Sequence, residues 1–160
     1  MEVEMKIRGL MMDPVTNMPI VILKDNGETV LPIWVGIYEA NAIALEIEKV
    51  TTPRPMTHDL LKNLLVGLET IVRKVVVTEL REDTFYAVIW LEREGQAISI
   101  DSRPSDALAL ALRMDCPIYV EEDVLKNSKQ ATAASDRVSS EELRKWLENL
   151  GEDDLGRYKM

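Results

Sequence analysis

Alternating apolar and polar residues dominate the first hundred positions and predict β-strands. In the opening segment, Val3, Met5 and Ile7 point to one side and the charged residues between them to the other. Pro32 lies inside one of these runs, which favours an edge strand or a bulge because proline cannot donate to a ladder. The strands predicted in this way are 2–11, 18–23, 29–35, 73–81, 84–92, 96–100 and 117–120.

A second pattern, with apolar residues three and four positions apart, predicts helices between groups of these strands. Thr57 is a plausible N-cap for a leucine-rich helix, and Ser139 with Glu142 forms a capping box before another. The helices predicted are 38–49, one from Thr57 to about Gly67, one from Pro104 to Arg113, one or two turns over 121–126, and 139–151.

The two strand-rich segments resemble each other, which indicates an internal repeat. Each has three predicted strands, then a polar corner and a helix of small residues, and in this alignment Asn41 falls opposite Asp106. Short connections between the strands favour antiparallel pairing. We therefore expect an α+β fold of duplicated β-β-β-α units forming a mostly antiparallel, curved or barrel-like sheet with packed helices. The two polar corners would then lie near a pseudo-twofold axis.

The length of 160 residues suits one domain with a substantial core. We expect that domain over residues 1–126. The polar, small-residue segment 127–138 reads as a linker, 139–151 as a C-terminal helix, and 152–160 as a disordered tail without periodicity.

Composition narrows the class of protein. Apolar residues make up 46% and charged residues 29%, with no apolar run long enough to span a bilayer and no signal-peptide pattern. The single cysteine, Cys116, excludes an intrachain disulfide, so we expect a reduced, cytoplasmic protein with no membrane partner. The net charge of −9 argues against broad, sequence-independent binding to nucleic acid, although it allows a local basic contact.

The most site-like stretch runs from Asp101 to Arg113, at a predicted strand-to-helix corner. Pro104 ends the strand and suits the first position of a helix, so Asp101, Arg103, Ser105 and Asp106 cluster at the corner. A purely structural interpretation also exists. Asp106 would be the third helical residue, facing free backbone N–H groups, while Asp101 would cap a turn with Arg103 as its ion-pair partner.

The run Arg54-Pro55-Met56-Thr57-His58-Asp59 is a second candidate, again at the start of a helix. His58 would lie in the first turn, where a neutral imidazole can accept a proton or bind a metal. The structural alternative is a surface histidine beside a capping threonine. If the fold brings this corner beside Asp101 and Asp106, the set would suit metal-assisted phosphodiester hydrolysis.

Other chemistries find little support in the sequence. There is no glycine-rich phosphate loop, no Gly-x-Ser-x-Gly elbow and no cysteine and histidine cluster. A nucleophilic Cys116 would need a base, and His58 is the one histidine. The tryptophans Trp34, Trp90 and Trp146 lie on apolar stripes, so we expect them in the core rather than as base-stacking platforms.

Three runs resemble the bifunctional nuclease domain family of bacteria, archaea and plants. They are Leu31–Gly36 with Glu39-Ala40, Arg54–Leu60, and Asp101–Ala107. The resemblance covers about residues 1–125. It implies an α+β fold, assembly into oligomers and, from the plant members, hydrolysis of both RNA and DNA. Matching the motifs adds Glu39 to His58, Asp101, Arg103 and Asp106 as candidate site residues.

The leading hypothesis is a metal-dependent nuclease acting on RNA or single-stranded DNA as a homo-oligomer, a dimer or higher. His58, Asp101 and Asp106 would be catalytic, with Asp101, Asp106 and Glu39 holding Mg²⁺ or Mn²⁺. Arg54, Arg103 and Ser105 would contact the substrate. The alternative is a non-catalytic oligomeric binding or regulatory module whose polar corners stabilise a subunit interface, which the net charge of −9 favours.

Overall fold

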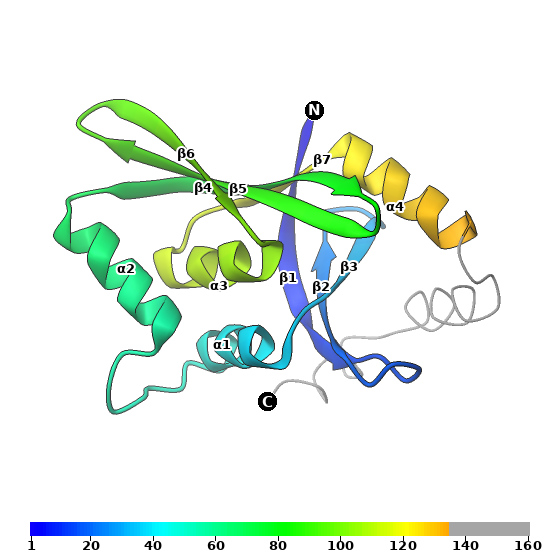
Figure 1. Ribbon diagram of the computed structural model, residues 1–160, viewed down its shortest axis with the longest axis horizontal. Coiled ribbons are helices and arrows are strands. Elements are labelled where there is room, and N and C mark those ends of the chain that lie inside the picture. Colours follow the sequence, from blue (N-terminus) through cyan, green and yellow to red (C-terminus); the bar gives the residue numbers. More distant parts are fainter. Residues whose placement is uncertain (135–160) are drawn as a thin grey trace.

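The computed structural model describes residues 1–134 and shows a curved β-sheet with helices packed on it (Figure 1). Within these residues there are seven strands in one sheet and four helices. The sheet is mostly antiparallel and stays open, so of the two predicted forms the curved sheet is correct and the closed barrel is not. The α+β class is confirmed. No helix in the described part of the chain is long and apolar enough to cross a membrane.

The first unit is three antiparallel strands followed by a helix. Pro32 lies on the outermost strand, which agrees with the edge position that the sequence predicts. The elements are β1 (Glu2–Met12), β2 (Pro19–Lys24), β3 (Val30–Trp34) and α1 (Ile37–Ile47).

The second unit repeats this order after an inserted helix. Its strands pair antiparallel, and one further strand and helix complete the described chain. The elements are α2 (Thr57–Gly67), β4 (Ile71–Arg81), β5 (Thr84–Arg93), β6 (Gln96–Ser102), α3 (Pro104–Met114), β7 (Ile118–Glu121) and α4 (Glu122–Ala134).

The strand order is β3-β2-β1-β7-β4-β5-β6, which places the two units on either side of β7. This order agrees with the predicted repeat. The predicted alignment of its helices is wrong by two residues, however. Both helices have eleven residues, and pairing their first residues sets Glu39, not Asn41, opposite Asp106. The buried alanines then match as well: Ala40 with Ala107, Ala42 with Ala109, and Ala44 with Ala111.

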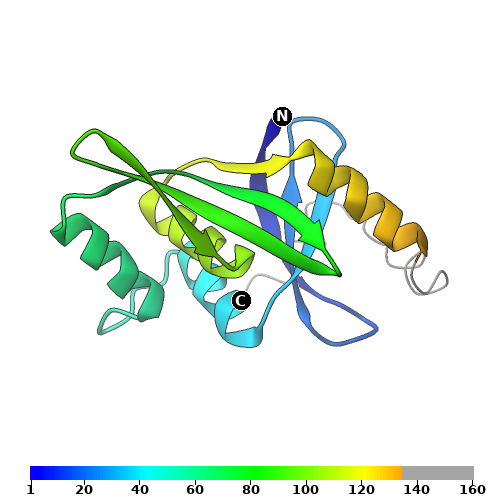
Figure 2. The ribbon, with the colours of Figure 1, turned by 45° about the horizontal axis from the view of Figure 1, so that its top comes forward.

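Curvature of the sheet brings its two ends together around the helices. In a flat sheet, the edge strands β3 and β6 would lie about 29 Å apart, at about 4.8 Å for each of six steps. Yet the helices that follow these strands, α1 and α3, pack against each other, and the views of Figure 1 and Figure 2 agree on this. Register shifts in the long strands β1 and β4 contribute, because β-bulges bend and twist a strand.

The core lies between the sheet and the small-residue faces of α1 and α3. Alanines let the two helices approach each other and the strands closely, while larger side chains fill the layer between. Among the fully buried large side chains are Met5, Leu23, Leu31, Ile43 and Leu108.

Helix α2 is the least buried of the three helices around this core. His58 is its one buried residue, and Leu65 packs partly against the core. The leucines that predict a buried apolar face are instead half exposed: Leu60 (52%), Leu64 (52%) and Leu68 (55%). Apolar burial therefore contributes less to holding α2 in place than it does for α1 and α3.

Several local predictions need correction. The segment predicted as a linker from Asn127 is helical as far as Ala134, because α4 continues through its alanines. The rest of that linker, the predicted helix 139–151 with Trp146, and the tail 152–160 lie outside the described residues. Thr57 is the first residue of α2 rather than its N-cap, which is Met56.

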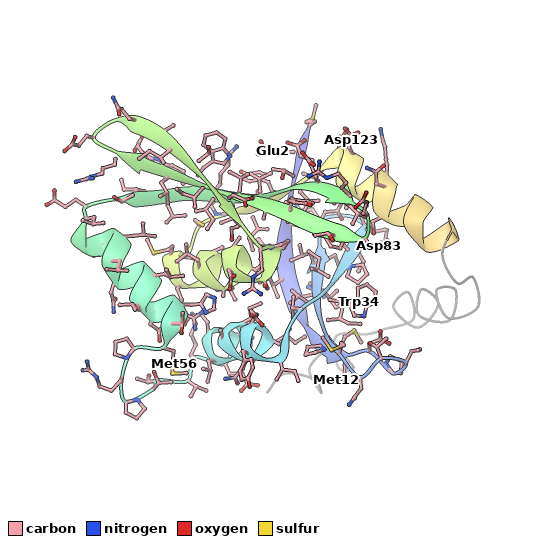
Figure 3. The ribbon with its side chains drawn as sticks, viewed as in Figure 1. Glu2, Met12, Trp34, Met56, Asp83 and Asp123 are labelled. Atoms are coloured by element: carbon pink, nitrogen blue, oxygen red, sulfur yellow. The ribbon has the colours of Figure 1, made fainter. Side chains whose placement is uncertain are left out.

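Trp34 does not lie in the core. It is 41% exposed at the end of β3, where Figure 3 labels it, and its indole N–H donates to Asp13 Oδ2 at 2.7 Å. An edge strand next to a turn leaves one face of such a side chain uncovered. Trp90, on β5, is partly buried.

Candidate active site

The first turns of α1, α2 and α3 meet, and their charged side chains form one connected cluster. Asp106 is the third residue of α3, as predicted, and both of its carboxylate oxygens have partners. Oδ1 is 2.8 Å from Nε2 of His58, and Oδ2 accepts a hydrogen bond from Nε of Arg103 at 2.9 Å. The structure therefore brings together the two corners that the sequence analysis singled out.

The contact with Asp106 determines which nitrogen of His58 is free. A carboxylate only accepts, so Nε2 carries the hydrogen and Nδ1 keeps its lone pair when the ring is neutral. Nδ1 has no partner within residues 1–134, and no buried side-chain nitrogen or oxygen there lacks a hydrogen bond. Nδ1 therefore reaches solvent, although the histidine as a whole is only 8% exposed.

Arg103 joins the first turn of α1 to that of α3. Besides Asp106, its Nη2 donates to Oε1 of Glu39 at 2.8 Å. The two carboxylates raise the pKa of the Arg103 guanidinium, with Asp106 contributing more than Glu39. The side chain is 65% exposed, and in the described residues its Nη1 has no partner, so two of its five N–H donors face solvent.

Gly36, the N-cap of α1, makes room for Glu39. A Cβ on this glycine would overlap the Glu39 carboxylate, which folds back over the start of its own helix. A carboxylate in this position is favoured by the free N–H groups and the positive end of the helix dipole. The absence of a side chain at Gly36 therefore helps to keep Glu39 within reach of Arg103.

A second ion pair lies two helical turns further along α3. Arg113 is 7% exposed, and its Nε donates to Oδ1 of Asp59 at 2.7 Å. Oδ2 of Asp59 accepts from the backbone N–H of Met56, which is labelled in Figure 3 at the start of α2. That backbone hydrogen bond, followed by the contact with Arg113, lowers the pKa of the Asp59 carboxyl.

Three of the predicted site residues lie outside this network. Asp101 is exposed on β6, and its carboxylate has no hydrogen bond or ion pair within the described chain, so the ion pair expected between Asp101 and Arg103 is not formed. Arg54 is exposed in the link before α2, where its carbonyl oxygen accepts from Oγ1 of Thr52 at 2.7 Å; its guanidinium has no such contact within residues 1–134. Ser105 is in the first turn of α3, 7% exposed. Their predicted roles stay predictions.

The predicted metal ligands do not form a metal site as their side chains lie. No group of three or more histidine, cysteine, aspartate or glutamate side chains within residues 1–134 is placed to hold an ion. Both oxygens of Asp106 are occupied, Arg103 binds Oε1 of Glu39, and Asp101 stands apart. The guanidinium of Arg103 binds Asp106 and Glu39, at the place where the prediction puts a metal ion.

Sequence reasoning gave no role to Asp59 or Arg113, although both lie within the two candidate runs. Arg113 follows Asp106 by seven residues, a spacing that places both on one face of a helix. Asp59 is the third residue of α2, the same position that Asp106 has in α3. Comparing the helix starts would have identified Asp59, whereas its pairing with Arg113 depends on how α2 packs.

Comparison with known proteins identifies a family for this chain. The model of the bifunctional nuclease domain matches residues 21–133, which include all the residues of the cluster. The chain belongs to the bifunctional nuclease domain family.

Relatives of this nuclease-domain chain fall into two groups. An uncharacterised protein of Mycobacterium tuberculosis strain H37Rv is 38% identical over 95% of this chain and 97% of its own length. Bifunctional nuclease 1 of Oryza sativa subsp. japonica and bifunctional nuclease 1 of Arabidopsis thaliana are each 28% identical over 76% of this chain. These matches cover 39% of each plant protein, so the plant nucleases are much longer chains.

Proposed function

We propose that this protein hydrolyses phosphodiester bonds in RNA or single-stranded DNA. The observation that carries the proposal is the contact between His58 and Asp106, with Arg103 bound to the same carboxylate. The pairing of a histidine with a carboxylate orients the ring and stabilises its protonated form, which is the arrangement of a general base. The family and its plant nucleases give further support.

In the proposed reaction, Nδ1 of His58 takes a proton from a water molecule. The oxygen of that water attacks the phosphorus, and the bond from phosphorus to the leaving oxygen breaks. Asp106 stabilises the imidazolium, which returns the proton to the leaving oxygen. The free Nη1 donors of Arg103 bind the non-bridging phosphate oxygens, where negative charge accumulates in the transition state. Arg54 and Ser105 stay predicted substrate contacts.

The dependence on Mg²⁺ or Mn²⁺ also stays a prediction. The residues as they lie do not fit a metal site, so the proposed step uses only the side chains of the cluster. Titration with either ion tests this prediction. A rise in melting temperature that disappears in Asp106→Ala would support a metal bound to that carboxylate, since a ligand that binds only the folded state stabilises it.

The proposal is tested with purified protein, a labelled RNA and a labelled single-stranded DNA, assayed with EDTA and with added Mg²⁺ or Mn²⁺. In His58→Gln, we expect the rate of cleavage to fall by about 10²- to 10⁴-fold, because the general base is removed. Activity must co-elute with the protein through two columns and change in proportion to the amount of folded variant.

A matched control uses a surface cation outside the cluster. Lys74→Met removes an ion pair with Glu2 at 2.8 Å and leaves the three helix starts untouched. We expect unchanged cleavage in this variant. Full activity in His58→Gln, or activity that separates from the protein, would contradict the proposal.

A second function is favoured by one observation, the half-exposed leucines of α2. Exposed apolar surface of this kind is typical of an interaction site, and it agrees with the alternative of an oligomeric binding or regulatory module. Light scattering of wild type and Leu64→Glu tests the predicted homo-oligomer. An assembled protein that never cleaves RNA or DNA would favour this alternative.

A further inference from the structure

Helix α2 carries His58, so whatever fixes the position of α2 also fixes the candidate base. Apolar burial holds it only in part, because His58 is the one buried residue of this helix and Leu60 and Leu64 are half exposed. Polar contacts of its first turn therefore share in the positioning. There are two of these with α3: the contact of His58 with Asp106 and the ion pair of Asp59 with Arg113.

Arg113 donates hydrogen bonds to the helices on both sides. Its Nη1 donates to the carbonyl oxygen of Ala109 in α3, and its Nη2 to that of Ala42 in α1, both at 3.0 Å. With Nε bound to Asp59, one guanidinium thus connects all three helices, and its side chain is only 3% exposed. The planar fork of arginine suits three acceptors in fixed directions, which an ammonium group cannot satisfy in the same way.

Asp59 connects this guanidinium to the first turn of α2. One oxygen accepts from Arg113, and the other accepts from the backbone N–H of Met56, directly before the helix. The carboxylate therefore fastens the backbone on both sides of Thr57 and His58. Asp106 and Arg113 are seven residues apart, about 10 Å along α3, so the two contacts together fix both the place and the direction of the first turn.

We propose that Asp59 and Arg113 form a positioning pair that holds the imidazole of His58 against Asp106. Neither side chain touches the reacting atoms; the pair acts by limiting the movement of the α2 start, so that Nε2 stays bonded and Nδ1 stays directed at solvent. Its effect on the rate of cleavage rests on the proposed function, whereas its effect on the geometry of His58 does not.

The geometry is tested by nuclear magnetic resonance of protein labelled with ¹⁵N in histidine. His58 is the only histidine of the chain, so its ring signals need no assignment. In wild type, we expect Nε2 to carry the proton and its N–H signal to exchange slowly with water. In Asp59→Asn, which keeps an oxygen for Met56 but loses the charged contact, we expect this exchange to speed up by about tenfold or more.

Arg113→Lys and Arg113→Met extend the test, and Lys74→Met is the control for loss of an ion pair elsewhere. We expect faster exchange in both Arg113 variants and no change in the control. If the Arg113 variants fail to fold, Asp59→Asn is sufficient to test the proposal, because it leaves both hydrogen bonds from Arg113 to backbone carbonyls in place. The proposal is overturned if folded Asp59→Asn shows the same proton exchange rate and the same imidazole tautomer for His58 as wild type.

Kinetics then separate this proposal from the proposed function. If both hold, Asp59→Asn lowers kcat by about 10- to 100-fold with little change in KM, because a misplaced base slows the chemical step and not binding. If wild type does not cleave but the exchange of the His58 proton responds as expected, the positioning pair stands and the nuclease proposal fails. Loss of activity with an unchanged His58 signal would contradict the positioning pair.

Discussion

The two strand-to-helix corners have nearly the same backbone but different side chains. The N-cap of α1, Gly36, has φ −70° and ψ 159°, and that of α3, Arg103, has φ −70° and ψ 145°. Each starts a helix of eleven residues with an acid at the third position, Glu39 in the first corner and Asp106 in the second. The repeat thus supplies two carboxylates in equivalent places.

What differs is the residue before each helix and the element that packs against it. The first corner has a glycine, which leaves space for Glu39, and the second has Arg103, which binds both acids. Only the second acid also contacts the inserted helix α2, through His58. The comparison indicates that the candidate chemistry belongs to the second corner and that the first corner supports it.

The largest expected effect comes from removing the charge of each acid in turn. Asp106→Asn should lower kcat/KM by about 10²- to 10⁴-fold, because an amide cannot stabilise the imidazolium of His58. Glu39→Gln should lower it by less than about tenfold, since Arg103 is the one hydrogen-bond partner of this carboxylate within residues 1–134. Equal losses in parallel cleavage assays would show that the corners share the chemistry.

The next largest effect is expected from Arg103→Gly, which gives the second corner the same N-cap residue as the first. We expect kcat/KM to fall by about 10²- to 10³-fold through loss of a phosphate contact. Arg103→Lys should lie between this variant and wild type, because lysine keeps the charge without the fork.

Stability serves as the control for the Arg103 variants. Arg103 is 65% exposed, so its ion pairs should contribute only about 0–1 kcal/mol to the free energy of unfolding. Urea denaturation measures this. A loss of several kcal/mol would indicate a structural role for the arginine.

A smaller effect is expected when the first corner loses its glycine. Gly36→Ala places a methyl group where the Glu39 carboxylate lies, so the hydrogen bond from Arg103 to Glu39 should be lost. We expect kcat/KM to fall only a few-fold. The free energy of unfolding should fall by up to about 1 kcal/mol. Gly67→Ala is the matched control, because nothing in residues 1–134 lies within 4 Å of the new methyl group, and it should stabilise the protein by up to about 1 kcal/mol.

The smallest expected effect is on how the free energy of unfolding depends on pH. Here the comparison is between Asp13 in the first unit and Asp59 in α2. Hydrogen bonds from Trp34, Val15 and Thr16 lower the pKa of Asp13 even though burial opposes the shift, and the Met56 N–H and Arg113 lower that of Asp59. A carboxyl with a lowered folded pKa binds protons more tightly when unfolded. It stabilises the fold above its unfolded pKa of about 3.9 and loses this as pH falls through the folded pKa.

Urea denaturation between about pH 2 and about pH 7 checks this prediction. Asp13→Asn and Asp59→Asn should each make the free energy of unfolding less dependent on pH below about 4. An unchanged slope in either variant would mean that its carboxyl has an ordinary pKa in the folded protein.

The sequence by itself determined the elements, their order and the repeat. Alternation of apolar residues gives the strands, and the alanines at 40, 42, 44, 107, 109 and 111 give two helices able to pack closely. These features are local, so they can be read from neighbouring residues. The same holds for Asp106 at the third position of α3, which Pro104 fixes.

Only the tertiary structure decided which charged groups meet. Curvature of the open sheet brings α1 and α3 together from its two edges, and that gives Arg103 its contact with Glu39 rather than with Asp101. The packing of α2 brings His58 to Asp106 across 48 positions of the chain and reveals the pairing of Asp59 with Arg113. Contacts of this kind depend on how twist and bulges add up over seven strands, and no short stretch of residues encodes that sum.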